Sequence, residues 1–298
     1  MEFLYETHCH TAESSRCASV SAAEQVRIYK NGGYTGIIVT DHFIHGNTII
    51  SNKLLWKSWE KKIHWFVKGY ETAKTEGDKI EPDVFFGWEY SHFGTHILTY
   101  GLGIDFLLAN PNMCRLNVKK YCVLIRENGG YVAQAHPFRT WMNLRKSPIN
   151  PALIDGIEVY NSKRSDKANT KAFKYASLHN LPVQSGTDSH KSNLAFYSGI
   201  TLDKKTDSIF DIIEAIKSKN VGLILPDNIK EMKFEAMKLP NISKTKPCPK
   251  CPYKLGKVQF MTNPCPSCKT NNYSMYEILA NGKYKPGEII VNDICQQK

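Results

Sequence analysis

The sequence has no long apolar run, and this absence excludes one broad class of protein. No stretch approaches the roughly 20 apolar residues that a membrane-spanning helix needs. The opening residues MEFLYETHCH also lack the basic start and apolar stretch of a secretory signal peptide. We therefore expect a soluble, cytoplasmic protein with no membrane partner.

Regularly spaced cysteines are missing from most of the chain. Nine cysteines is an odd number, and five of them are scattered along the chain: Cys9, Cys17, Cys114, Cys122 and Cys295. A disulfide framework is therefore not expected in a cytoplasmic chain of 298 residues. That length is enough for one large domain with a buried core and a small appendage.

Short strand-like runs alternate with helix-like runs as far as about residue 225. Ser21 and Glu24 form a capping box that begins one helix, and two glycines at 32 and 33 end it. A further helix is expected from about Leu54 to Lys74. Alternating strands and helices favour parallel pairing, and this many units favour a closed barrel. The sequence therefore predicts an α/β barrel.

Polar residues follow the strand-like runs where each run ends. His8 and His10 alternate along an extended strand, so both leave the same face while Cys9 points away. In a barrel of parallel strands, the carboxyl ends share one face, where active sites are built. The candidates at these ends are His8, His10, Asp41, His42, Glu89, His136, Glu158, Asp188 and His190.

This mixture of imidazoles and carboxylates suits zinc, manganese or iron better than calcium or magnesium. A carboxylate can bridge two such ions and leave open positions for water and substrate. The pair then activates a water and stabilises the attacking and leaving oxygens of a phosphoryl displacement. We expect two or three divalent ions in the barrel.

Six segments occur in order over residues 3–225: ETHCHT, GIIVTDHF, GWEYS with THILTYG, VAQAHPF, DGIEVYNS and SGTDSH. Together they resemble the motifs of the polymerase and histidinol phosphatase (PHP) family. The resemblance implies a distorted (β/α)7 barrel over residues 1–240. It also implies a hydrolase that cleaves phosphate esters with a metal-activated water.

The resemblance further implies three groups of metal ligands. The first contains His8, His10, Glu89 and Asp188; the second shares Glu89 and adds His96 and His136; the third contains His42 and His190. The third group departs from the family pattern, which often has Asp or His seven residues after the first histidine, where this chain has Ser15. Glu13 is the alternative ligand for that position, so the third ion remains open.

Four carboxylates and one arginine complete the predicted site. Glu89, Asp188 and Asp41 are the expected catalytic carboxylates. We expect Asp41, and Glu158 with it, to orient a ligand or a bound water. Arg139 is expected to bind a substrate phosphate, because a guanidinium presents paired donors. A surface arginine paired with a carboxylate is the alternative for Arg139.

The composition changes after Pro240, where a segment rich in Pro, Ser, Lys and Asn separates the barrel from residues 241–298. Two CxxC pairs follow: Cys248 with Cys251, and Cys265 with Cys268. This spacing predicts a zinc ribbon in which all four cysteines bind one structural zinc in a closed site. Its role would be folding, not chemistry.

The ribbon is rich in lysine, which favours a nucleic-acid partner and therefore a nuclease acting on phosphodiesters. A phosphatase of small molecules or nucleotides is the alternative within the same chemistry. A non-catalytic, metal-binding or regulatory protein is a second alternative. A third is hydrolysis of a non-phosphate substrate such as an amide, because fold alone does not decide function.

Overall fold

The described strands form one nine-stranded sheet. The computed structural model describes residues 2–49, 58–141, 144–145, 148–192 and 198–226. The order in the sheet is β11-β10-β1-β2-β3-β4-β5-β8-β9. The strands are β1 (Phe3–Cys9), β2 (Gly36–Val39), β3 (Asp83–His92), β4 (Thr95–Tyr100), β5 (Tyr131–Gln134), β8 (Gly156–Asn161), β9 (Val183–Gly186), β10 (Gly199–Leu202) and β11 (Gly222–Ile224), with β6 (Thr140–Trp141) and β7 (Leu144–Arg145) as a separate pair.

The sheet curves until its ends nearly meet. Strand β1 lies inside the sheet order, yet it also contacts β9 at the far end. Beyond the strand ends, Cys9 and Ser189 form an isolated parallel bridge, and the His10 N–H donates to the Ser189 carbonyl at 3.0 Å. The chain is thus an α/β protein with a nearly closed, barrel-like sheet, as predicted.

Strand directions differ from the predicted (β/α)7 plan. Strands β1, β2 and β3 pair in parallel, as do β5, β8 and β9. Strand β4 runs antiparallel to both of its neighbours, and β10 runs antiparallel to β1 and β11. The expectation of parallel pairing throughout was therefore wrong for β4, β10 and β11.

A tight hairpin explains the direction of β4. His92 pairs with Thr95, which leaves only Phe93 and Gly94 in the turn. Both turn residues have positive φ angles, 46° and 76°. Such a two-residue turn matches the twist of antiparallel strands. As a result, His96 lies at the beginning of β4 but at the same edge of the barrel as the end of β3.

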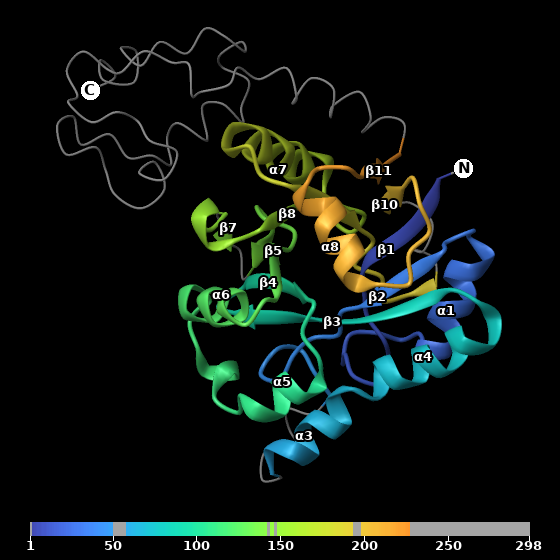
Figure 1. The fold of residues 1–298 in the computed structure, drawn as a ribbon. Helices are drawn as coiled ribbons and strands as arrows, with labels where there is room; N and C mark the ends of the chain where they lie inside the picture. The colour runs from blue at the N-terminus through green and yellow to red at the C-terminus, as the bar shows by residue number, and fades with distance from the viewer. Residues whose placement is uncertain (1, 50–57, 142–143, 146–147, 193–197, 227–298) are drawn as a thin grey trace, which may run out of the picture.

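The helices cover the outside of the sheet (Figure 1). Helices α1 and α4 lie side by side and pack on β2 and β3, while α7 packs on β8. The helices are α1 (Ala22–Asn31), α3 (Trp59–Phe66), α4 (Lys68–Ile80), α5 (Ile104–Ala109), α6 (Val118–Glu127), α7 (Asp166–His179) and α8 (Ile209–Lys217), with the short 3-10 turns η1 (Met113–Arg115) and η2 (Pro151–Leu153).

Local sequence signals account for several helix ends. The Ser21 side chain accepts from the Glu24 N–H and begins α1, and Gly33 follows its end with a φ of 77°. This confirms the predicted cap. The helix expected over 54–74 is instead two helices, α3 and α4, which meet at Val67; residues 50–57 lie outside the described part of the chain.

The barrel interior contains an apolar cluster that α8 covers. Ile212 and Ile216 of α8 pack with Ile38, Leu98 and other buried residues of the strands. Above this cluster lies a buried polar set that we call the tyrosine layer. It consists of Thr7, Tyr100, Tyr131 and Gln184, all at most 1% exposed.

The tyrosine layer satisfies its own hydrogen bonds. The Tyr131 hydroxyl donates to Gln184 Oε1 at 2.9 Å, and Gln184 Nε2 donates to the Tyr100 hydroxyl at 2.8 Å. That hydroxyl in turn donates to the Thr7 carbonyl at 2.7 Å. Burial holds the pKa of both tyrosines well above the usual range, so they remain neutral donors.

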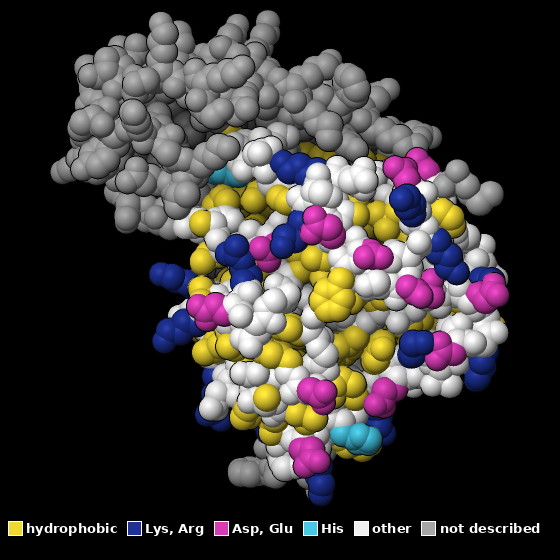
Figure 2. Space-filling model, viewed as in Figure 1, with side chains coloured by type: hydrophobic (Ala, Val, Ile, Leu, Met, Phe, Trp, Pro, Cys, Tyr) yellow, Lys and Arg dark blue, Asp and Glu magenta, His cyan; other side chains and the backbone are white. Residues whose placement is uncertain are grey.

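Positive and negative side chains are both present on the face of the barrel shown in Figure 2, where they are interspersed. None of the described helices has the length and apolar character needed to cross a bilayer. The described cysteines Cys9, Cys17, Cys114 and Cys122 are free thiols.

The predicted ribbon cannot be compared with this structure. Its four cysteines, Cys248, Cys251, Cys265 and Cys268, and the predicted domain boundary at residue 240 all lie outside the described residues. The zinc ribbon therefore stays a prediction.

Candidate metal centre

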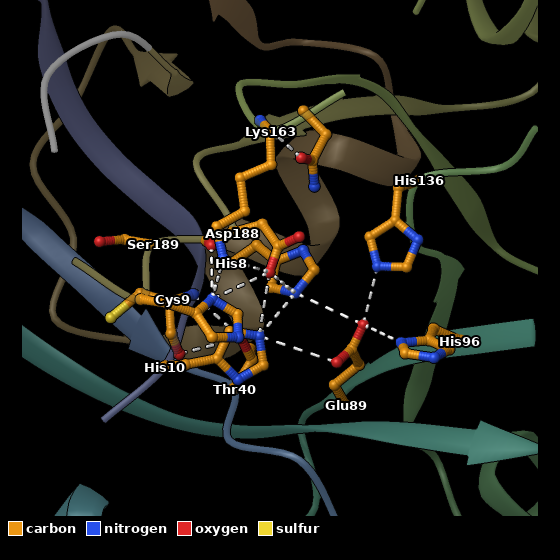
Figure 3. A network of polar contacts seen from close by, with 12 residues as sticks. His8, Cys9, His10, Thr40, Glu89, His96, His136, Lys163, Asp188 and Ser189 are labelled. Carbon is orange, nitrogen blue, oxygen red and sulfur yellow. Dashed lines mark hydrogen bonds and ion pairs between the residues drawn. The ribbon is translucent and has the colours of Figure 1, made fainter. Parts of the chain in front are cut away.

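Histidines and carboxylates from separate strands meet at one rim of the barrel, in a cluster that we call the histidine layer (Figure 3). Its members are at most 6% exposed, apart from His96, which is part-buried. They fall into four overlapping groups whose candidate ligand atoms lie within 4.8 Å of one another: His8 with His10 and Asp188; His8 with Glu89 and His136; His42 with Glu89 and His96; and His10 with His42 and His190. The structure thus brings together every barrel ligand that the sequence predicted except Glu13.

Hydrogen bonds orient the imidazoles. His8 Nδ1 lies 2.9 Å from Glu158 Oε1, and His10 Nδ1 lies 3.1 Å from Ser15 Oγ. These contacts favour the tautomer with the proton on Nδ1, because Glu158 is an acceptor. The Nε2 atoms of His8 and His10 lie only 3.1 Å apart. Two lone-pair nitrogens that point at one small space suit a shared cation.

Glu89 stands between the two sides of the layer, as Figure 3 shows. Its Oε1 lies 2.6 Å from His96 Nδ1 and 3.0 Å from His136 Nε2. Its Oε2 lies 2.6 Å from His42 Nδ1, but without the geometry of a hydrogen bond. A fully buried carboxylate oxygen that lacks a hydrogen bond is a strong candidate to bind metal.

Electrostatics favour the protonation states that bind cations. Burial lowers the pKa of His136 to about 3 and holds that of His10 well below its usual range. Burial raises the pKa of Glu89 and Asp188, but nearby histidines outweigh it and hold both pKa values well below the usual range. Neutral imidazoles and ionised carboxylates are the forms that bind divalent ions.

Burial lowers the pKa of His42, but Glu89 and Cys17 outweigh burial and raise it to about 10. His8 likewise differs from His10 and His136. Burial lowers its pKa, but the carboxylates of Glu158, Asp188 and Glu89 outweigh burial and raise it to about 9. These carboxylates therefore favour a positive charge beside them. A divalent ion would supply that charge, so the residues present fit two or more such ions.

Two ligand candidates have unusual backbone angles. His136 has a φ of 27° and Asp188 a φ of 54°, both in the left-handed region. Residues without glycine's freedom enter this region at a cost of about 1–3 kcal/mol, typically at functional sites. A close approach also constrains the layer, because a Cβ at Gly186 would lie 2.6 Å from His8 Cβ and 2.9 Å from Glu158 Oε1.

Asp41 acts from behind the layer. Its Oδ1 accepts from the Thr11 N–H at 2.7 Å and from the Ser15 hydroxyl at 2.6 Å, and its Oδ2 accepts from the Thr11 hydroxyl at 2.7 Å. Both oxygens are thus occupied by the loop that follows β1. The structure supports the predicted orienting role, through Ser15 to His10, and gives Asp41 no direct contact with a reacting group.

Glu13 is a correction to the prediction. Its two carboxylate oxygens accept from the Ala22 N–H at 3.0 Å and 2.8 Å, at the first residue of α1. A helix amino end attracts a carboxylate because its N–H groups are unpaired and its dipole is positive there. The carboxylate is therefore occupied away from the metal groups found in the described residues.

Beside the histidine layer lies a pocket of about 440 Å³. Its walls include Arg139, the residue predicted to bind phosphate, together with Lys163, Arg164 and Cys17, which sequence reasoning missed. The signal for the first two was available, because they follow the end of β8 just as the other candidates follow their strands. Arg164 Nη2 donates to Asp188 Oδ2 at 2.8 Å, and Arg139 Nη1 lies 3.0 Å from His96 Nε2.

Comparisons with known proteins show a shared fold. No protein-family model matches the chain, and no curated protein matches it in sequence. Among solved structures, it is similar to a two-domain protein from Bacteroides vulgatus that contains a predicted PHP-like metal-dependent phosphoesterase. The identity is 15%, the match covers 79% of this chain and 70% of that chain, and the TM-score is 0.56.

Two further structures are more distant. PsfC from Pseudomonas syringae shares 15% identity over 79% of this chain and 96% of that chain, with a TM-score of 0.48. An amidohydrolase from Chromobacterium violaceum, with bound sulfate and no metal, shares 14% identity over 76% of this chain and 99% of its own, with a TM-score of 0.47. At these identities the likeness to the first structure establishes the fold of the barrel and nothing finer.

Proposed function

We propose that the protein is a metal-dependent hydrolase of phosphate esters, and that its substrates are small phosphorylated molecules that enter the pocket. The observation that carries this proposal is the set of positively charged side chains beside the histidine layer. Arg139, Lys163 and Arg164 all line the same pocket of about 440 Å³ as His42, His136 and other candidate ligands. Cationic side chains next to a candidate metal site suit an anionic substrate.

Two of these positively charged side chains have unpaired donors that could bind an anion. The Nε–H groups of Arg139 and Arg164 are buried and have no acceptor among the described residues. Burial lowers the pKa of Arg139 and of Lys163, which means that their positive charges are incompletely compensated. A phosphate would offset this cost, because a guanidinium presents paired N–H donors to its oxygens.

The residues divide the chemistry between them. Divalent ions held by the histidine layer would supply a nucleophilic water at neutral pH and Lewis acidity toward the phosphate. Arg139 and Arg164 would hold the phosphate oxygens, and Lys163 would compensate the negative charge that grows during displacement. Asp188, held ionised, would orient His8 and His10 and keep Arg164 at the pocket wall.

The nuclease hypothesis rests on a different part of the chain. Its motive is the lysine-rich segment 241–298, which lies outside the described residues. The face in Figure 2 mixes both signs of charge over the described residues, so it offers no comparable argument. A small ester is accordingly the substrate that the pocket supports best.

The test is turnover of a substrate panel by metal-loaded protein: a phosphomonoester, a small phosphodiester, a nucleoside bisphosphate, single-stranded DNA and RNA, and an amide. We expect the small phosphate esters to be hydrolysed, with Zn²⁺, Mn²⁺ or Fe²⁺. Arg139→Gln should raise KM about tenfold, which corresponds to about 1.4 kcal/mol.

Arg126→Gln is the matched control, because Arg126 pairs with Asp155 and the Ala152 carbonyl outside the pocket. It should leave KM unchanged. Hydrolysis of the amide alone would overturn the proposal. Turnover confined to DNA or RNA and suppressed by salt would instead support the nuclease hypothesis.

A further inference from the structure

The group of His10, His42 and His190 differs from the other three groups in having no carboxylate. His10 Nε2 also belongs to a second group, since it lies 3.3 Å from Asp188 Oδ1. A cation held by His42 and His190 therefore lacks an anionic ligand of its own within this group. A neighbouring side chain would have to supply one.

Glu89 and Asp188 face the Nδ1 sides of His42 and His190 and belong to the other groups. Two oxygen-bearing side chains of the loop that follows β1 are also already used. Ser15 Oγ donates to Asp41 and receives contacts from His10 Nδ1 and from the His42 N–H, at 3.1 Å and 3.0 Å. Glu13 is bound at the beginning of α1. Neither is free to turn toward His42 and His190.

Cys17 occupies the required place. Its Sγ lies 3.2 Å from His42 Nε2, and Cys17 lines the same pocket as His190. A tetrahedral zinc with usual Zn–S and Zn–N lengths separates sulfur from nitrogen by about 3.6 Å. The observed separation is thus close to that of two ligands on one ion.

The two histidines present the correct atoms to this sulfur. His42 Nδ1 faces Glu89, and His190 Nδ1 lies 2.7 Å from the Asp188 carbonyl. Each ring therefore has its Nε2 available on the side away from those contacts. All three side chains line the pocket, so an ion between them would be open to substrate.

We propose that Cys17, His42 and His190 form a metal site with one thiolate and two imidazole ligands, open toward the pocket. The thiol releases its proton to solvent when the cation binds. Sulfur and imidazole ligands select zinc over manganese or magnesium. Three protein ligands with one open position is the arrangement of a catalytic zinc, not of a closed structural one. The inference holds whichever ester the pocket accepts.

The test uses the full chain, stripped of metal under reducing conditions and reconstituted with Co²⁺. Sulfur bound to Co²⁺ gives a near-ultraviolet charge-transfer absorption. Cys17→Ser should lose about one bound ion per chain and part of this absorption. Cys17→Asp should keep the ion but lose the same part of the absorption, because an oxygen ligand replaces sulfur. The four C-terminal cysteines contribute equally to all samples, so differences between variants isolate Cys17.

Cys114→Ser is the matched control, because Cys114 is a free thiol beside the Pro111 carbonyl, distant in sequence from every candidate ligand of this site. It should keep both the ion and the absorption. Circular dichroism of the metal-free variants establishes that each is folded. A folded Cys17→Ser protein with the wild-type ion count and absorption would overturn the proposal.

Peptide-resolved alkylation gives a second, independent measurement. Cys17 is exposed, whereas Cys9 is buried. Zn²⁺ should protect Cys17 from iodoacetamide and leave the labelling of Cys9 unchanged. Equal labelling of Cys17 with and without Zn²⁺ would count against ligation.

Discussion

The tyrosine layer and the histidine layer are both buried inside one barrel, but they differ in whether their polar atoms have hydrogen-bond partners. Tyr100, Tyr131 and Gln184 donate to and accept from one another or the backbone. Glu89 Oε2 and His136 Nδ1, by contrast, have no hydrogen-bond partner among the described residues. Because unpaired buried polar atoms cost about 1–3 kcal/mol each, the second layer is incomplete without a ligand.

Strand direction separates the two layers. His96 begins β4 and Tyr100 ends it, while Tyr131 begins β5 and His136 follows its end. The same two strands therefore carry a self-sufficient network at one end and a ligand-accepting cluster at the other. A polar network that closes on itself stabilises the fold, and one that stays open can bind.

The largest difference between the layers should come from Asp188→Asn. We expect hydrolysis to fall by about a hundredfold or more, a change of about 2.7 kcal/mol in the barrier, because His8, His10 and Arg164 all face this carboxylate. Steady-state kinetics on the metal-loaded protein measures it. Asp78→Asn, on the exposed surface of α4, is the control. Activity above about a tenth of wild type would contradict the assignment.

Removal of metal should destabilise the folded protein by an amount similar to the barrier change expected for Asp188→Asn. Ions at about 100 times their dissociation constant stabilise the folded state by about 2.7 kcal/mol, so chelation should lower the melting temperature. Thermal denaturation with EDTA, and after metal is restored, measures the shift. Asp188→Asn should show a smaller shift, because this variant lacks one ligand of the barrel site. Any metal in the predicted ribbon contributes equally to both proteins. An identical shift in the two would place all the bound metal outside the barrel.

The tyrosine layer should respond in stability and not in activity. Tyr100→Phe removes one donated and one accepted hydrogen bond and should cost about 2 kcal/mol, while Tyr131→Phe removes one and should cost about 1 kcal/mol. Urea denaturation of metal-free protein measures both. Values of kcat should stay within about twofold of wild type. A large loss of kcat in a folded variant would show instead that the two layers act as one functional unit.

A modest effect, confined to metal affinity, should come from Ser15→Ala. This change breaks the link from Asp41 to His10 Nδ1, and loss of such a supporting contact weakens metal binding by about tenfold or about 1.4 kcal/mol. Competition with a fluorescent chelator measures the affinity. Ser218→Ala, at the exposed end of α8, should leave it unchanged. Equal affinities in the two variants would make the Ser15 contacts irrelevant to the site.

Much of the histidine layer was predictable because it depends on local periodicity and strand ends. Alternation along β1 placed His8 and His10 together, and Cys9 indeed packs in the apolar cluster behind the strand. The positions of Glu89, His136 and Asp188 followed from the ends of strand-like runs. His96 was also predicted, although through a family resemblance and not through strand direction, since the antiparallel β4 was missed.

Glu13 and Ser15 show where local reasoning fails. Spacing along the chain made Glu13 a possible ligand, but the beginning of α1 lies nearby and binds its carboxylate. Ser15 was recognised only as a missing ligand, whereas the fold makes it the contact between Asp41 and His10. Both outcomes depend on which groups neighbour a loop in space.

The sequence by itself determined the side chains that can bind metal, their alternation on β1 and the helix cap at Ser21, because these depend on strand and helix geometry over a few residues. Only the tertiary structure decided that β4 runs antiparallel, that Arg164 and Lys163 face the same pocket as Arg139, and that Cys17 lies against His42 and His190. Those relations join residues distant along the chain, and their positions follow from how the sheet closes and how its loops pack, which no local pattern encodes.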